Sequence, residues 1–134
     1  MLPFEFIVDG PPVSQQARRR DRIDAWKETV RNAAKHYWPL GGEPVSADVQ
    51  LKVTYFYLST DMDIDNIVKP IQDAMNGLVY LDDRQITDLI VRKRDLTATL
   101  HITRSTPILE EGIAKEHEFL FIEIALAPDP TIID

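Results

Sequence analysis

Cysteine is absent from the 134-residue sequence, which excludes a disulfide framework, a thiolate metal site and a cysteine nucleophile. The N-terminus lacks the basic region and long apolar run of a signal peptide, and no apolar stretch is long enough to span a membrane. Internal repeats, low-complexity segments and interdomain linkers are lacking as well. Together with the chain length, these absences predict one compact cytoplasmic domain that comprises residues 1–134.

Acidic residues are unevenly distributed along this chain, whose formal net charge is -7. Residues 110–134 carry a net charge of -6, and the other 109 residues carry -1. Six acids of that larger part lie in two short stretches, and without them it would total +5. The sequence therefore describes a mildly basic body around an acidic site, followed by an acidic C-terminal region. This pattern permits a polyanionic partner.

Hydrophobic periodicity predicts a single α+β domain, in which two main helices pack against a mixed β-sheet. The expected strands are residues 4–8, 48–58, 87–94, 97–103 and 119–127, and the expected helices are residues 22–38 and 65–75. Asp21 and Asp65 are candidate N-caps of these helices. Residues 110–117 fit a loop or a short irregular helix, and residues 128–134 fit a loose tail.

Aspartates alternate directly after the second expected strand, at Asp61, Asp63 and Asp65. On an extended segment this spacing puts three carboxylates on one face, and a second acidic pair follows at Asp82 and Asp83. Adjacent side chains point to opposite sides of a strand, so only one of that pair is expected to join the others. Clustered carboxylates repel each other unless a cation is bound, and Mg²⁺ prefers carboxylate and phosphate oxygens. The cluster therefore predicts a Mg²⁺ site for phosphate chemistry.

Other interpretations of these aspartates remain open from the residues alone. Single Asp residues are common in turns and at helix caps, which would give them a structural role. Asp61, Asp63 and Asp65 also match the first three ligand positions of an EF-hand, but Asn66 and Gln72 stand where glycine and glutamate are needed. A phosphatase with an aspartyl nucleophile in a D-x-D turn would need a longer chain.

Three short motifs lie in this region: Asp63-x-Asp65-Asn66-x-x-Lys69, Asp73-Ala74-Met75-Asn76-Gly77 and Asp82-Asp83-x-Gln85-Ile86. Their order and spacing resemble the core of the RusA-type Holliday junction resolvases. These are Mg²⁺-dependent endodeoxyribonucleases of DNA recombination and repair, often encoded in phage and prophage DNA. The resemblance covers most of residues 4–95. It implies a RusA-like fold, a homodimer, hydrolysis of four-way DNA junctions, and Mg²⁺ as the cofactor, with Mn²⁺ as a substitute.

The resemblance also assigns roles to individual residues. Asp63, Asp65 and Asp83 would be catalytic and hold the metal, and Lys69 would be needed for cleavage. A lysine there can neutralise charge on the phosphate, although its spacing fits equally well a structural partner of Asp73 or Asp65. The supporting polar groups beside them would be Asn66, Asp73 and Asp82.

Basic residues are candidates for contacts with the DNA backbone, because arginine pairs well with phosphate. These candidates are Arg18, Arg19, Arg20, Arg22, Arg92, Lys93 and Arg94. Along a strand, alternation puts Arg92 and Arg94 on one face and Lys93 on the other. A four-way junction has approximate two-fold symmetry and needs two matched cuts, which suits a symmetric dimer.

Two other functions are open for the same pattern. One is a nuclease of this fold that acts on other branched DNA. The second is a catalytically silent, metal-stabilised DNA-binding or interaction protein, whose acidic C-terminal region imitates DNA or binds a partner. Replacing Asp65 by Asn separates these hypotheses, because only an enzyme would lose cleavage while it keeps binding.

Overall fold

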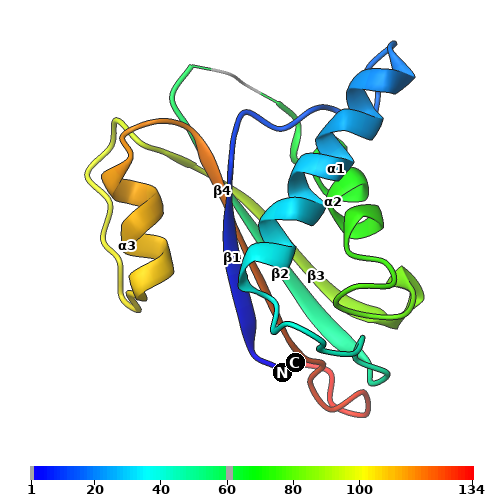
Figure 1. Cartoon of the computed structure of the whole chain (residues 1–134). Coiled ribbons are helices and arrows are strands. Elements are labelled where there is room, and N and C mark those ends of the chain that lie inside the picture. Colours follow the sequence, from blue (N-terminus) through cyan, green and yellow to red (C-terminus); the bar gives the residue numbers. More distant parts are fainter. Residues whose placement is uncertain (1, 60–61) are drawn as a thin grey trace.

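A four-stranded sheet organises the protein in the computed structural model, which describes residues 2–59 and 62–134. The strands are β1 (Phe4–Asp9), β2 (Val49–Tyr57), β3 (Ile86–Asp95) and β4 (Phe119–Leu126). Their order across the sheet is β1-β4-β2-β3, as Figure 1 shows. β4 runs antiparallel to both β1 and β2, whereas β2 and β3 are parallel. The sheet is therefore mixed, and the predicted α+β class is confirmed.

One face of the sheet is covered by two helices, α1 (Arg20–Tyr37) and α2 (Val68–Ala74). Alternate residues of each strand point toward these helices, and on β2 they are Val49, Leu51, Val53 and Tyr55, all fully buried. α1 adds Trp26 and Val30 to this core. Burial of this apolar area is the main stabilising contribution to the fold.

Parallel neighbours need a crossover connection, and the segment between β2 and β3 provides it. It contains the 3-10 helix η1 (Ile64–Asn66), then α2, then a second 3-10 helix η2 (Asp83–Gln85). The expected continuous helix over residues 65–75 is thus divided into two pieces. Pro70 explains this division, because proline is tolerated only in the first turn of an α-helix. All three acidic motifs lie in this crossover.

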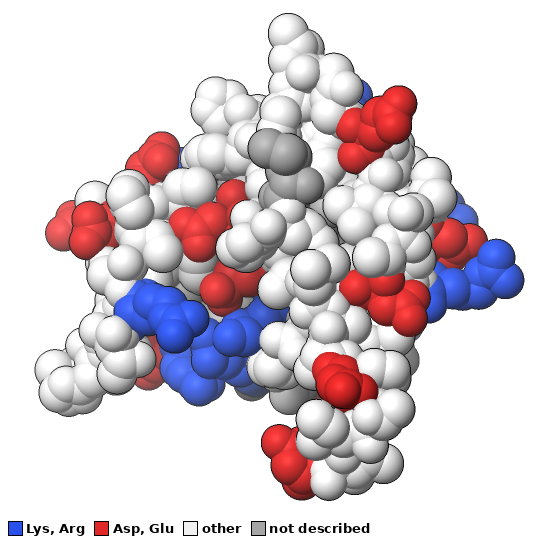
Figure 2. Space-filling model, turned by 90° about the horizontal axis from the view of Figure 1, so that it is seen from below, with Lys and Arg blue, Asp and Glu red and all other residues white. Residues whose placement is uncertain are grey.

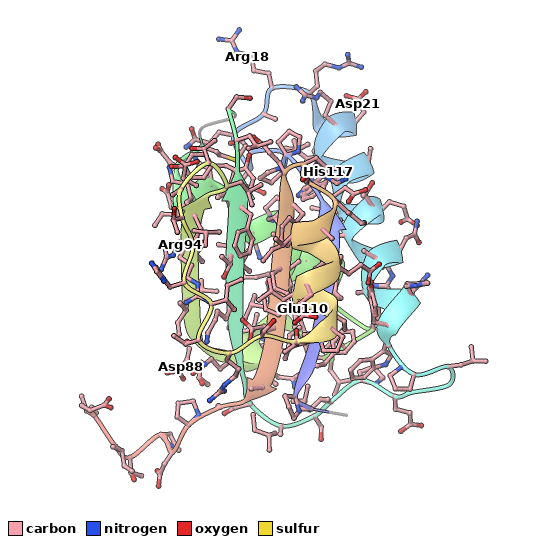
Figure 3. All side chains as sticks on the ribbon, turned by 90° about the vertical axis from the view of Figure 1, so that its left-hand side faces the viewer. Arg18, Asp21, Asp88, Arg94, Glu110 and His117 are labelled. Carbon is pink, nitrogen blue, oxygen red and sulfur yellow. The ribbon has the colours of Figure 1, made fainter. Side chains whose placement is uncertain are left out.

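The opposite face of the sheet carries α3 (Pro107–Ala114), which covers only part of it (Figure 3). Its Leu109 joins a small apolar cluster with Ile7 and Phe121. In the same cluster Phe56 and Phe119 stack with ring centroids 4.6 Å apart. The remainder of this face, over β2 and β3, carries no helix and is open apart from the loop 96–106, which passes in front of it (Figure 3).

Some local expectations are wrong, and one is partly confirmed. Residues 97–103 form no strand, because the chain turns after β3: the Asp95 carboxylate accepts hydrogen bonds from the Thr97 amide (2.8 Å) and hydroxyl (2.7 Å). The segment 110–117, expected as a loop or a short irregular helix, does belong largely to a short helix, α3, which begins earlier, at Pro107. Asp21 is not the N-cap of α1; Arg19 holds that position, and its guanidinium pairs with Asp21 at 2.6 Å.

Asp65 is not a cap either, since it lies inside η1. The C-terminal tail, residues 128–134, is exposed and lacks helix or strand. Across residues 2–59 and 62–134, no helix has the length and apolar character that a bilayer span requires.

Candidate active site in the crossover

Asp63 and Asp65 lie at the start of the crossover, where the chain has left the buried strand β2. Asp63 occupies the N-cap position of η1 and Asp65 its second residue, and both side chains are exposed. Within the described part of the chain, neither carboxylate forms a hydrogen bond or an ion pair. Asp61, the third aspartate of the alternating set, lies outside the described residues. Two carboxylates are thus presented to solvent with their oxygens available.

The polar N-terminal loop lies against this acidic turn. The Gln15 amide donates a 3.0 Å hydrogen bond to the Asn66 carbonyl, so Asn66 contributes its backbone to the contact. This bond brings the basic stretch that follows Gln15 near the acidic residues. Arg18 projects away from the body of the protein (Figure 3), and Arg22 is also exposed.

The neighbouring Arg19 and Arg20 already have acidic partners on α1. Arg19 pairs with Asp21, and the Arg20 Nε lies 3.6 Å from Asp24. Both arginines are well exposed, and such surface pairs exchange readily for other partners.

Lys69 is the centre of a compact charge cluster. Its ammonium lies 2.7 Å from Asp83 Oδ2 and 2.9 Å from Asp73 Oδ1, and Lys27 of α1 reaches Asp73 at 3.4 Å. The hydrogen bond to Asp83, followed by that to Asp73, raises the pKa of Lys69. The structure thus brings Lys69, Asp73 and Asp83 together across 14 residues of sequence.

Asp82 and Asp83 are adjacent but have different partners. The Asp82 carboxylate accepts a hydrogen bond from the Arg84 amide at 3.1 Å, and this bond lowers the pKa of Asp82. Gln85 completes a capping box, because its Oε1 accepts from the amides of Leu81 (2.8 Å) and Asp82 (3.0 Å). Asp82 therefore shapes the turn that delivers Asp83 to Lys69.

Gln85 also anchors this turn to the segment before β2. Its Nε2 donates to the carbonyls of Val45 at 2.7 Å and Ala47 at 2.8 Å. Every hydrogen-bonding position of this side chain is thus used, which fixes η2 relative to the sheet. The glutamine of the third motif is thus explained by the needs of this turn.

Tyr80 lies beneath the charge cluster and is fully buried. Its hydroxyl donates to the Gln72 carbonyl at 2.7 Å. Burial raises the pKa of Tyr80, and the negative charges of Asp83 and Asp73 raise it further. Tyr80 is therefore a neutral donor at any ordinary pH.

Sequence reasoning missed Glu118, which it counted with the acidic C-terminal region. Glu118 is buried, and its Oε2 accepts from the amides of Leu58 (2.7 Å) and Ser59 (2.9 Å), directly after β2. The Tyr55 hydroxyl donates to its other oxygen. Glu118 thus fixes the point where the chain leaves the sheet toward Asp63. Its sequence signal is weak: a single Glu before an apolar strand.

Arg31 was missed as well. From α1 its guanidinium donates to the carbonyls of Ala74 (3.1 Å) and Asn76 (2.8 Å) at the end of α2. These carbonyls have no partner within a helix that ends there. Arg31 therefore has a structural task, and it joins α2 to α1.

The basic residues of β3 are divided between the two faces of the sheet. Lys93 lies over the Tyr57 ring, 5.9 Å from its centroid, on the face that carries the helices. Arg92 and Arg94 line a groove on the other face. The predicted alternation is correct, and it means that these three residues cannot contact one common DNA segment from one face.

Carboxylate oxygens are suitable ligands for a hard cation, and Asp63 and Asp65 have theirs free. Asp83, in contrast, directs Oδ2 toward the Lys69 ammonium. Among the described residues, no three Asp, Glu, His or Cys side chains come close enough together to hold a metal ion. The chemistry of the donors fits Mg²⁺, but these side chains do not form a ready cage.

Comparison of the sequence with known proteins identifies a family for this chain. Residues 11–103 match the family model described as Endodeoxyribonuclease RusA. A 35-residue segment is 51% identical to the "Uncharacterized protein YqaN" of Bacillus subtilis (strain 168). That segment is 26% of this chain and spans about a quarter, 25%, of the YqaN protein. The family match includes β2, the acidic crossover and β3, and the chain belongs to the RusA endodeoxyribonuclease family.

Proposed function

We propose that the protein is a Mg²⁺-dependent endodeoxyribonuclease that cuts four-way DNA junctions by phosphodiester hydrolysis. The observation that carries the proposal is the crossover itself. There, two exposed and unpartnered carboxylates, Asp63 and Asp65, precede a lysine that is bound to Asp83 and Asp73. Family membership supports nuclease chemistry, and the donor set supports a hard cation.

Asp63 and Asp65 would hold the cation, because their oxygens project into solvent where a phosphate can approach. When bound, Mg²⁺ polarises the phosphate, lowers the pKa of the attacking water and stabilises the leaving oxygen. Asp83 would become a third ligand if its oxygen exchanged Lys69 for the metal. Lys69 would then be released toward the phosphate, where its charge stabilises the transition state.

The supporting groups follow from the contacts around this cluster. Asp73 holds Lys69 from the adjacent turn of α2. Asp82 maintains the turn before Asp83, and Asn66 binds the N-terminal loop. These three residues position the site without touching the substrate.

The substrate and assembly belong to the same proposal. Branched DNA with two-fold symmetry would be cut by a homodimer with one crossover site per subunit. The DNA contacts are proposed for Arg18, Arg19, Arg20 and Arg22 beside the acidic turn, for Lys93 on the same face of the sheet, and for Arg92 and Arg94. A cytoplasmic location and a role in recombination and repair fit this activity.

Cleavage of a labelled four-way junction tests the proposal, beside a linear duplex of the same sequence, with Mg²⁺, with Mn²⁺ and with EDTA. We expect paired symmetric cuts on the junction with either metal and none with EDTA. D65N should abolish cleavage while binding survives or tightens, because repulsion between carboxylate and phosphate is reduced. D129N, in the exposed tail, is the matched control and should cut normally.

A silent DNA-binding protein is the second candidate. The observation in its favour is that Asp83 already pairs with Lys69, and the described carboxylates do not converge on one point. Binding of the junction without any cutting by the wild type would support this alternative. If the protein cuts flaps or forks in preference to four-way junctions, the proposed nuclease activity stands, but its substrate is another kind of branched DNA.

A further inference from the structure

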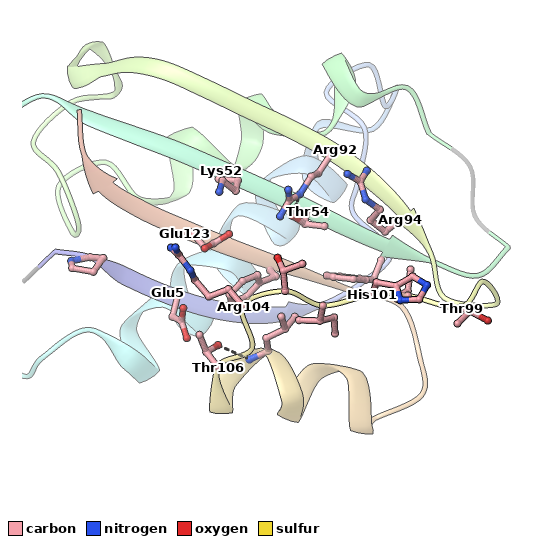
Figure 4. A pocket seen from close by; sticks show the side chains of 17 residues that line it. Glu5, Lys52, Thr54, Arg92, Arg94, Thr99, His101, Arg104, Thr106 and Glu123 are labelled. Atoms are coloured by element: carbon pink, nitrogen blue, oxygen red, sulfur yellow. Dashed lines mark hydrogen bonds between the residues drawn. The ribbon is translucent and has the colours of Figure 1, made fainter. Parts of the chain in front are cut away.

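The open face of the sheet holds a groove that the acidic crossover does not use. Its volume is about 790 Å³. We call it the sheet groove; its floor is formed by Lys52 and Thr54 of β2 with Arg92 and Arg94 of β3, and its far wall by residues 99–104 and α3 (Figure 4). α3 covers only the part of this face near β1 and β4, and the loop 96–106 passes in front of β2 and β3 (Figure 3), so the groove lies between this loop and the sheet.

Four cations line the sheet groove: Lys52, Arg92, Arg94 and Arg104. Within residues 2–59 and 62–134, none of the four forms an ion pair. Viewed from below, Lys and Arg side chains gather in one patch on this side of the protein (Figure 2). Like charges gathered in a concave surface repel each other, and a bound anion removes that cost.

Two of these guanidinium groups are held in place by neutral acceptors. Arg92 Nε donates to the Thr54 hydroxyl at 2.8 Å, and Arg94 Nη1 donates to the Lys93 carbonyl at 2.8 Å. Each guanidinium keeps further N–H groups for a ligand, since arginine has five. The arginines are therefore oriented but not neutralised, as an anion site requires.

The carboxylates of the sheet groove show where an anion would not bind. Glu5 and Glu123 are direct neighbours across β1 and β4, and Glu123 is in register with Lys52 of β2. The charge of this face thus changes from acidic on β1 and β4 to basic on β2 and β3. An anionic ligand is directed to the edge of the sheet, where Arg92 and Arg94 lie.

We propose that the sheet groove binds the sugar-phosphate backbone of a DNA arm other than the arm being cut, which rests on the proposed function. Arg92 and Arg94 are two residues apart on a strand, so their Cα atoms are separated by about 6.8 Å. This spacing lets two planar guanidiniums bind phosphates of one strand, each in the bidentate geometry that arginine favours. Thr54 and the neighbouring backbone hold them ready for this contact.

The position of the sheet groove explains why the ligand would be a separate arm. The groove lies on one face of the sheet, whereas α2 and Lys93 lie on the other face. A DNA strand bound in the sheet groove and a DNA strand bound at the crossover would therefore lie on opposite sides of the edge strand β3. Branched DNA sends arms in different directions and can engage both faces, whereas a straight duplex engages one. The groove would thus favour branched over linear DNA.

Binding measurements with metal-free protein in EDTA test this inference, using fluorescence anisotropy of a labelled four-way junction and of a linear duplex at several salt concentrations. In R92Q/R94Q we expect the salt slope of junction binding to fall by about two, one for each phosphate that is no longer neutralised. The affinity ratio of junction to duplex should fall too. R92K/R94K keeps both charges and should retain the slope. E123Q removes a repulsive charge and should tighten junction binding.

K35Q, on the exposed side of α1, is the matched control and should leave slope and ratio at the wild-type values. A thermal unfolding curve and a molar mass by light scattering, taken for every variant, separate impaired folding or altered assembly from impaired binding.

Several results would overturn the inference. If the salt slope of R92Q/R94Q is unchanged while the wild type binds and cuts the junction, the sheet groove does not bind DNA, but the proposed nuclease activity stands. If R92Q/R94Q loses the same affinity for the junction and for the duplex, the sheet groove does not bind a separate arm of the DNA. If R92Q/R94Q has a different molar mass from the wild type, the sheet groove is instead an interface between copies of the protein. A wild type that binds but does not cut refutes only the nuclease, and one that binds no DNA refutes both.

Discussion

Lys69 connects two carboxylates of the crossover, and its charge is what keeps them close. Its pKa is raised from the ordinary 10.5, because Asp83 and then Asp73 accept hydrogen bonds from the ammonium. A raised pKa in the folded state means that the stabilisation is complete below the unfolded value and is lost as the pH rises through the folded value. At neutral pH the cluster is therefore intact.

Replacing Lys69 by Met tests this assignment. Lys69 is about half exposed, so we expect a loss of no more than about 1 kcal/mol in the free energy of unfolding at pH 7. The difference from wild type should begin to shrink above pH 10.5 and should be lost as the pH rises through the raised pKa of the folded protein, where the wild-type lysine also loses its charge. Urea unfolding between pH 7 and pH 11 measures it. A constant difference across that range would show that packing of the side chain, and not charge, is responsible.

Glu118 is a positioning residue, because it holds the backbone that leads to Asp63. In E118Q the remaining oxygen can still accept from the two backbone amides, but an amide nitrogen replaces the oxygen that accepts from the Tyr55 hydroxyl, and the hydrogen bonds lose the negative charge that strengthens them. We expect a loss of about 1–3 kcal/mol in the free energy of unfolding. Hydrogen exchange should accelerate at the Leu58 and Ser59 amides. E28Q, exposed on α1, is the control; equal exchange in both variants would contradict the role.

At the level of elements, α3 depends on the absence of a side chain at Gly112. A Cβ built there would lie 2.4 Å from the Phe119 ring, and Phe119 is fully buried against Phe56. Alanine favours a helix by about 1 kcal/mol over glycine, but overpacking costs about 1–3 kcal/mol. We expect G112A to lower the thermal unfolding temperature and to reduce hydrogen-exchange protection of α3. A stabilised G112A would mean that α3 can shift at no cost.

Strands and helices with a strong period could be predicted from sequence, and segments fixed by single polar contacts could not. The apolar residues of β2 and β4 alternate clearly, and those of α1 recur every three to four residues. All three elements lie where these patterns predicted them. Apolar and polar residues alternate over residues 97–103 too, but a strand forms only where it can pair with the edge of another strand. Asp95 turns the chain onto the open face instead, where Leu100 packs beside the Phe56 and Phe119 cluster.

The candidate site was only partly accessible to the same reasoning. Spacing indicated that Lys69 and Asp73 share a helix face, and they do pair. The link from Lys69 to Asp83 depends on the η2 turn, which Gln85 anchors to a distant loop. Glu118 lies even further along the sequence. Contacts of this kind follow from tertiary packing, which periodicity does not encode.

For the whole molecule, the acidic tail can be separated from the folded body. Residues 128–134 are exposed, and the hydrogen bonds of Thr131 and Ile132 are made within the tail, to Asp129. We expect a chain ending at residue 127 to unfold at the wild-type temperature. Its affinity for DNA should rise at low salt, because two negative charges are removed, and the gain should vanish as screening increases. A lower unfolding temperature would reveal a structural role of the tail.

β3 also forms one edge of the sheet, pairing with β2 in the described structure. A strand of ten residues with a free edge can recruit a strand from another molecule and start aggregation. Leu89 and Ile90 are exposed on it, whereas Arg92, Lys93 and Arg94 make the same strand strongly charged. These three residues would then have a second benefit, protecting the protein from self-association at high concentration. Selection for solubility alone could preserve them, even in a relative that no longer binds DNA.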